Sequence, residues 1–99
     1  MNISKKLEGD KLTVALEGRL DSNTSRMLEE ELFDSLDGIT TLIFDFENLE
    51  YLSSAGIRVV LSAYSMLEEN GGTATIINPN EEIVEIFEIT GLTEILALD

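Results

Sequence analysis

The sequence contains no cysteine, no histidine and no tryptophan. It therefore lacks thiolate nucleophiles, histidine general bases and disulfide bonds, and carboxylates are the only common zinc ligands that remain. The chain also has no GxxxxGK[ST] phosphate loop, no GxGxxG dinucleotide loop and no GxSxG nucleophile elbow. We expect a protein that is not an enzyme, with no catalytic residues, no cofactor and no metal site.

Positive charge is scarce as well. Six Lys and Arg residues face 20 Asp and Glu residues, which gives a formal net charge of −14. Because binding to nucleic acid needs clustered Lys or Arg, nucleic acid is not an expected partner. A protein partner attracted by charge would present a basic face to this chain.

Long apolar runs are also missing. No run of about 18 apolar residues occurs, and the N-terminal MNISKKLEGD has two lysines without the apolar segment of a signal peptide. We therefore expect a cytoplasmic protein without membrane insertion.

The residues that are present fit one folded domain. The chain has 99 residues, 43% of them hydrophobic, and a single proline. This is enough apolar material for one core, and no linker or internal repeat divides the sequence. We expect residues 1–99 to form a single domain.

Five stretches have the composition of β-strands. Alternating apolar residues over 12–16, behind a Gly-Asp turn at 9–10, predict an N-terminal hairpin with its first strand at 3–7 and its end at Gly18. The other predicted strands are 41–46, 73–77 and 95–98. The run over 41–46 has almost no polar interruption, which is typical of a central strand covered on both faces.

Three stretches between the strands have helical periodicity. The first predicted helix starts within 21–24 and ends near Gly38. The second starts at Ser53 and ends at 70–72, and the third starts at Asn78 and ends at Gly91. In the third helix, Asn78 is the predicted N-cap and Pro79 the first helical residue. The predicted apolar stripes consist of Met27, Leu28, Leu32, Phe33 and Leu36, then Ile57, Val60, Leu61, Tyr64 and Leu67, then Ile83, Ile86 and Phe87.

The order of these elements predicts an α/β (α+β) fold. We expect a mixed, mainly parallel sheet with an N-terminal edge hairpin and with helices between the strands. In such sheets the loops that leave the carboxyl ends of strands meet at one edge, where ligands and partners usually act. The predicted loops over 18–24 and 48–56 are of this kind.

Two serines, Ser53 and Ser54, open the second predicted helix and are followed by the small residues Ala55 and Gly56. The free amides and dipole of a helix N-terminus stabilise an anion, so a phosphate on Ser54 would be tolerated there, and the small residues would let a partner's backbone approach. The alternative interpretation is that one serine is only an N-cap and that the small residues serve close packing of the helix on the sheet. Spacing alone favours the alternative.

Three carboxylates, those of Asp21, Asp45 and Glu47, could meet at the predicted strand ends. Paired carboxylates serve as acid and base in glycoside hydrolysis. In a chain with 20 acidic residues, however, such a cluster is expected by chance. The hydrolase interpretation is therefore disfavoured.

The strings FENLEYLSSAGIRVVL and GRLDSNTSRMLEEEL resemble the two signatures of STAS-domain proteins, in particular of bacterial anti-sigma factor antagonists. The element order, the late GLTEIL and the length agree, so the resemblance covers nearly the whole chain. The resemblance implies that Ser54 is the phosphoacceptor, that Asp21 is the acid beside it and that Asp45 is the acid ending the central strand. It also places Gly18 and Gly56 on glycines of the family pattern.

The family commonly has an aspartate immediately before the phosphoacceptor, where this chain has Ser53, which remains a competing acceptor. The expected partner-binding surroundings of the acceptor are Asp21, Asp45, Ser53, Ala55, Gly56 and Arg58. The resemblance implies that the unphosphorylated chain binds an anti-sigma factor that is also a serine kinase, and so releases a sigma factor for transcription. Phosphorylation would end this binding, and a PP2C-type phosphatase would restore it.

A second function stays open. The same resemblance also covers STAS modules that act without phosphorylation, as an accessory subunit of a transport ATPase or as a signalling scaffold. The serine at position 53, where the family has aspartate, favours this alternative.

Overall fold

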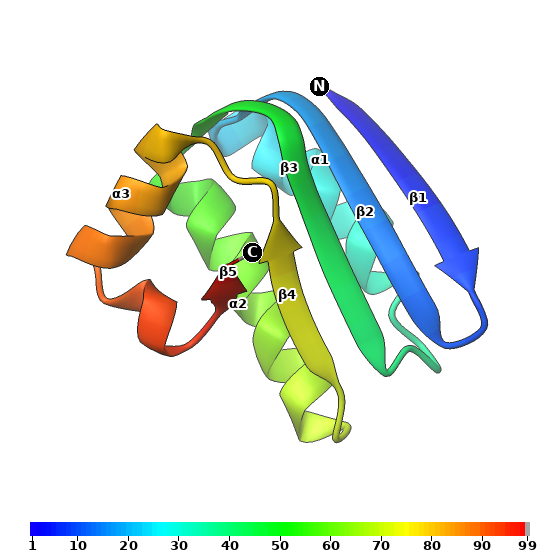
Figure 1. The fold of residues 1–99 in the computed structure, drawn as a ribbon. Coiled ribbons are helices and arrows are strands. Elements are labelled where there is room, and N and C mark those ends of the chain that lie inside the picture. Colours follow the sequence, from blue (N-terminus) through cyan, green and yellow to red (C-terminus); the bar gives the residue numbers. More distant parts are fainter. Residues whose placement is uncertain (99) are drawn as a thin grey trace.

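The structure is a computed structural model that describes residues 1–98, and it contains one five-stranded sheet in the order β1-β2-β3-β4-β5 (Figure 1). The elements are β1 (Asn2–Glu8), β2 (Lys11–Leu20), α1 (Ser22–Phe33), β3 (Thr41–Leu52), α2 (Ser54–Glu69), β4 (Thr73–Ile77), α3 (Glu81–Ile89), a 3-10 turn (Leu92–Glu94) and β5 (Ala97–Leu98). β1 pairs antiparallel with β2, and all other pairs are parallel. The predicted fold class, with its edge hairpin, is confirmed.

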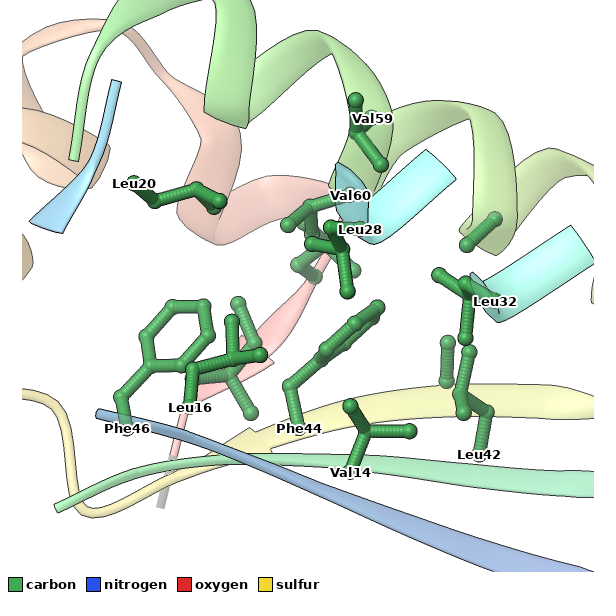
Figure 2. Close-up of a cluster of buried hydrophobic side chains, with 14 of the residues drawn as sticks. Val14, Leu16, Leu20, Leu28, Leu32, Leu42, Phe44, Phe46, Val59 and Val60 are labelled. Carbon is green, nitrogen blue, oxygen red and sulfur yellow. The ribbon is translucent and has the colours of Figure 1, made fainter. Parts of the chain in front are cut away.

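The hydrophobic core lies on one face of the sheet. Along β3, Leu42, Phe44 and Phe46 are fully buried, whereas the residues between them, such as Ile43 and Asp45, are half-buried. Figure 2 shows the buried strand side chains meeting those of α1 and α2, and Figure 1 shows both helices on the same side of the sheet. The prediction that this strand is covered on both faces is therefore wrong, because both crossover helices pack on one face.

β2 and β3 run further than the sequence predicted, to Leu20 and Leu52. β3 contains two bulges, because the pairing with β2 gains an extra β3 residue opposite the step from Ala15 to Glu17 and another opposite the step from Gly18 to Arg19. Gly18 has φ of 107°, a conformation that glycine adopts without strain, and it lies inside the strand instead of ending it. The predicted loop over 48–56 is accordingly short, because β3 continues to Leu52.

The first two helices bury only part of the stripes that the sequence predicted. α1 ends at Phe33, so Leu36 is buried from the following loop, and Met27 is exposed because it points away from the core side of the helix. In α2, Val60 and Leu67 are buried as predicted, together with Val59, Ala63 and Gly56. The other predicted members of the α2 stripe, Ile57, Leu61 and Tyr64, are half-buried at its margins.

The third helix starts two residues later than predicted. Asn80, not Asn78, is the N-cap, and its side chain accepts a hydrogen bond from the amide of Ile83 at 2.9 Å. Asn78 has φ of 56°, so it turns the chain before the helix begins. The predicted strand over 73–77 is confirmed, whereas the last strand, β5, is limited to Ala97–Leu98. Within residues 1–98, none of the helices is long and apolar enough to cross a membrane.

Candidate functional site

The N-termini of α1 and α2 lie side by side at one edge of the sheet. Leu20 and Leu52 form the last pair between β2 and β3, and the amide of Ser53 donates a hydrogen bond to the carbonyl oxygen of Leu20 at 2.9 Å. Each strand then turns into its helix within a single residue, Asp21 or Ser53. The two bulges in β3 thus bring these two helix caps together.

Asp21 caps α1. Its Oδ1 accepts hydrogen bonds from the amides of Asn23 and Thr24, each at 3.0 Å, and the hydroxyl oxygen of Thr24 accepts one from the Asp21 amide at 2.8 Å. The hydrogen bonds from Thr24, with smaller contributions from the Asn23 amide and the charge of Arg19, hold the pKa of Asp21 below its ordinary value. The site therefore contains a carboxylate that is ionised at neutral pH.

Ser53 and Ser54 have different roles in the first turn of α2. Ser53 is the N-cap, and its half-buried Oγ accepts a hydrogen bond from the amide of Gly56 at 3.1 Å. Ser54 is the first helical residue, is exposed, and makes no side-chain hydrogen bond within residues 1–98. Its hydroxyl is available to a modifying enzyme, whereas that of Ser53 already completes the helix.

Gly56 serves packing. It is buried, and a Cβ atom added there would lie 2.8 Å from Cγ of Leu20 and 2.9 Å from Cδ1 of Leu52. A partner's backbone cannot approach Gly56 as the functional interpretation required, so the packing alternative holds for this residue. Ala55 is half-buried and faces α1.

A groove of about 200 Å³ separates the first turns of α1 and α2. It is lined by Ser22, Ser25, Arg26, Glu29, Ala55, Arg58 and Val59. Arg58 is exposed and lies four residues after Ser54, on a neighbouring part of the same helix face. The structure thus places Arg58, Ala55, Asp21 and Ser54 at one edge, and their role in partner binding and phosphorylation stays a prediction.

The structure does not bring Asp45 to this edge. Asp45 pairs with Ala15, six positions before Asp21 on the neighbouring strand, which is about 20 Å along the strand. It accepts hydrogen bonds from the amide of Glu47 at 3.0 Å and the side chain of Asn78 at 3.2 Å. Asp45 therefore does not end the central strand, because β3 continues to Leu52 beyond the bulges.

The proposed carboxylate cluster of Asp21, Asp45 and Glu47 consequently does not form. In the part of the chain that the structure describes, no group of three or more acidic side chains is placed to hold a metal ion.

Sequence reasoning missed one pair beside the site. The guanidinium of Arg19 lies 4.2 Å from the centre of the Tyr51 ring, and Tyr51 is 42% exposed. The two residues face each other across β2 and β3. Their pairing depends on the register set by both bulges, and no spacing in the sequence indicates it.

The chain belongs to the STAS-domain family, whose profile matches residues 2–99. The resemblance inferred from the sequence is thereby confirmed. Among curated relatives, BtrV of Bordetella bronchiseptica, assigned as an anti-sigma factor antagonist, is 34% identical over 85 residues, which are 85% of this chain and 73% of that protein. The anti-sigma-B factor antagonist of Bacillus subtilis is 25% identical over 96 residues, which are 97% of this chain and 88% of that protein.

Among solved structures, the Bacillus cell fate determinant SpoIIAA in its phosphorylated form superposes with a TM-score of 0.80 at 22% identity. The match covers 99% of this chain and 91% of SpoIIAA. At this level of identity the likeness confirms the fold. The class of the named relatives agrees with the class that the sequence indicated, the anti-sigma factor antagonists.

Proposed function

We propose that this chain is a protein-binding switch of the anti-sigma factor antagonist type, controlled at Ser54. In its unphosphorylated form it binds an anti-sigma factor that is also a serine kinase, and so releases a sigma factor. The kinase phosphorylates Ser54 and ends the binding, and a PP2C-type phosphatase restores it. The observation that carries this proposal is the exposed hydroxyl of Ser54, which makes no hydrogen bond within residues 1–98 and lies beside Ser53, the N-cap of α2.

The position of Ser54 favours a charge-based switch. A phosphoserine carries about 1.5 to 2 negative charges at neutral pH. At Ser54 this charge would lie near the ionised carboxylate of Asp21, on the same edge of the sheet. A partner that packs closely there would have to desolvate the phosphate and accept its bulk, so phosphorylation opposes docking.

The surface around Ser54 has the composition of a docking site. Tyr51, Arg19 and Arg58 lie at the same edge, and Tyr and Arg are the residue types that dominate binding energy at interfaces. The chain as a whole carries a net charge of −14, which supports a partner with a basic face. A protein of this kind works by binding rather than by catalysis, and sigma factor control places it in the cytoplasm.

The second candidate is a STAS module that acts without phosphorylation, as an accessory subunit of a transport ATPase or as a scaffold. It is favoured by Ser53, which stands where the family commonly has aspartate. This candidate predicts binding that does not depend on the state of Ser54.

Isothermal titration of the chain with the kinase anti-sigma factor of the same organism separates the two candidates. We expect Ser54→Ala to bind like the unmodified chain and phosphoserine installed at position 54 to weaken binding at least tenfold. Phosphoserine installed at Ser4, which is exposed on β1, is the matched control and should leave the affinity unchanged. Equal affinity of the unmodified and the Ser54-phosphorylated chain would favour the second candidate.

A further inference from the structure

The groove between α1 and α2 contains two of the chain's three arginines, Arg26 and Arg58. Neither guanidinium forms an ion pair or a hydrogen bond with another residue in the described range 1–98. The remaining arginine, Arg19, stacks on Tyr51. In a chain with 20 acidic side chains, two arginines that share a groove and have no carboxylate partner among residues 1–98 form a site with unused capacity for an anion.

Ser25, whose hydroxyl is buried, is one of the residues that line the same groove. Ser25 is only 3% exposed, and its Oγ has no hydrogen-bond partner among the described residues. Buried polar side chains in folded proteins nearly always have such a partner. Ser25 therefore keeps an unused hydrogen-bond donor beside the groove, and an oxygen atom of a group bound close to it would accept that hydrogen bond.

Ser54 lies at the margin of this groove. Four residues of helix correspond to a rotation of about 400°, so Arg58 is offset from Ser54 by only about 40° around α2. The offset is toward Ala55 and Val59, which line the groove. Helical side chains lean toward the N-terminus, so the long side chain of Arg58 extends back toward Ser54.

We propose that this groove is a phosphate-binding site in which Arg58, assisted by Arg26, holds the phosphate of phosphorylated Ser54. The inference rests on the proposed function and names the residues that bind the phosphate group once it is on Ser54. Guanidinium groups bind phosphate oxygens through paired, charge-assisted hydrogen bonds, and the N-terminus of α2 adds a favourable dipole. Arg58 is then engaged by the phosphate, so its guanidinium no longer offers hydrogen-bond donors to a partner that docks at this edge.

The test uses phosphoserine installed at position 54 during translation and a phosphorus NMR titration of its second pKa. Asp21 and Glu29 are the carboxylates near the site and oppose ionisation of the phosphate, so variants of one chain are compared. We expect Arg58→Gln to raise the phosphate pKa by about half a pKa unit or more and Arg26→Gln to raise it less. Lys11→Gln is the charge-matched control, because Lys11 is exposed at the opposite end of β2, and it should leave this pKa unchanged.

A direct signature accompanies the titration. In the phosphorylated chain, and only there, the Nε–Hε signal of Arg58 should move downfield and exchange more slowly with water. Equal phosphate pKa values in Arg58→Gln and Lys11→Gln, or an Arg58 signal that does not respond to the phosphate, would overturn the proposal.

A second arm identifies the source of the phosphate. Inorganic phosphate should perturb the amide signals of Arg26 and Arg58 saturably in Ser54→Ala, but not in the phosphorylated chain, whose own phosphate fills the groove. Saturable binding to both would show that the groove takes phosphate from another molecule and would contradict the intramolecular site. These titrations use no kinase. If the kinase failed to modify Ser54, the proposed function would be refuted, while the phosphate-binding site could still be tested with installed phosphoserine.

Discussion

The amide of Ser53 donates a hydrogen bond to the carbonyl oxygen of Leu20, 2.9 Å away, and this contact joins the ends of two parallel strands. One residue beyond each end a helix begins, so the caps of α1 and α2 are neighbours. The phosphoacceptor proposed here, Ser54, follows directly. Its position is therefore set by strand pairing in the sheet, while its exposed side chain makes no hydrogen bond with the residues that the structure describes.

The two serines should differ in their effect on stability. Ser53→Ala removes the N-cap of α2 and should lower the free energy of unfolding by about 1 kcal/mol. Ser54→Ala removes an exposed hydroxyl without a partner in the described residues and should change it by less than about 0.5 kcal/mol. Urea denaturation of both variants measures this. Equal losses would contradict the division of roles between them.

The charge of Asp21 should stabilise the fold in a pH-dependent way. Its pKa lies below the ordinary value of 3.8, so the stabilisation is complete above that pH and is lost as the pH falls through the lower pKa of the folded state. Asp21→Asn keeps a capping oxygen but removes the charge. We expect this variant to be less stable than the natural chain at neutral pH, and the difference to vanish in acid.

The control for this measurement is Glu85→Gln, which neutralises an exposed acid on α3. The difference in stability between Glu85→Gln and the natural chain should not show the loss in acid that is expected for Asp21→Asn. Denaturant titrations from neutral pH to below pH 3.8 provide the comparison. A difference for Asp21→Asn that persists unchanged in acid would mean that the capping geometry, and not the charge, stabilises α1.

Gly56→Ala should destabilise the protein although alanine is the better helix former. The added Cβ atom would lie within 3 Å of Leu20 and Leu52, and such overpacking typically costs about 1 to 3 kcal/mol. The gain in helix propensity offsets up to about 1 kcal/mol of this. We expect a net loss of about 1 to 2 kcal/mol by thermal or urea unfolding. Ser62→Ala, at an exposed position of the same helix, should leave the stability nearly unchanged. A Gly56→Ala variant as stable as the natural chain would show that α2 can shift to make room for the Cβ atom.

Tyr51 should contribute to partner binding and little to stability. Its ring is 42% exposed beside the site and is held by Arg19, so it presents a rigid aromatic surface. Tyr51→Ala should weaken capture of the anti-sigma factor about tenfold or more. Ile89→Ala removes a more exposed apolar side chain on α3 and should leave the affinity unchanged. If both variants bind alike, the docking surface lies elsewhere.

Sequence periodicity was sufficient for the element order and for the hairpin, because alternation and helical spacing are local properties. It was insufficient for the strand ends. The bulges in β3 insert residues after Asp45 and after Leu49, and a bulge has no signature in a run of mixed residues such as 45–52. For this reason Asp45 was expected at the strand end and in fact lies well before it.

The site could be predicted where it depends on a helix start, and it could not where it depends on register. Ser54 and Asp21 follow from capping patterns and from the family resemblance, and the structure places them at one edge. Arg19 and Tyr51 meet only across paired strands, and the Arg26 and Arg58 groove requires the packing of α1 against α2. These contacts between distant segments are visible only in the folded chain.

The most direct test of the Ser54 switch is mass spectrometry of the chain after incubation with the kinase anti-sigma factor and ATP. The account predicts the addition of a single phosphate, located at Ser54 by peptide fragmentation and absent from Ser54→Ala, while Ser53→Ala is still modified at position 54. Ser53 is held as the N-cap, so its hydroxyl should not be a substrate. A phosphate found on Ser53, or no phosphate although the kinase binds the chain, would contradict the account.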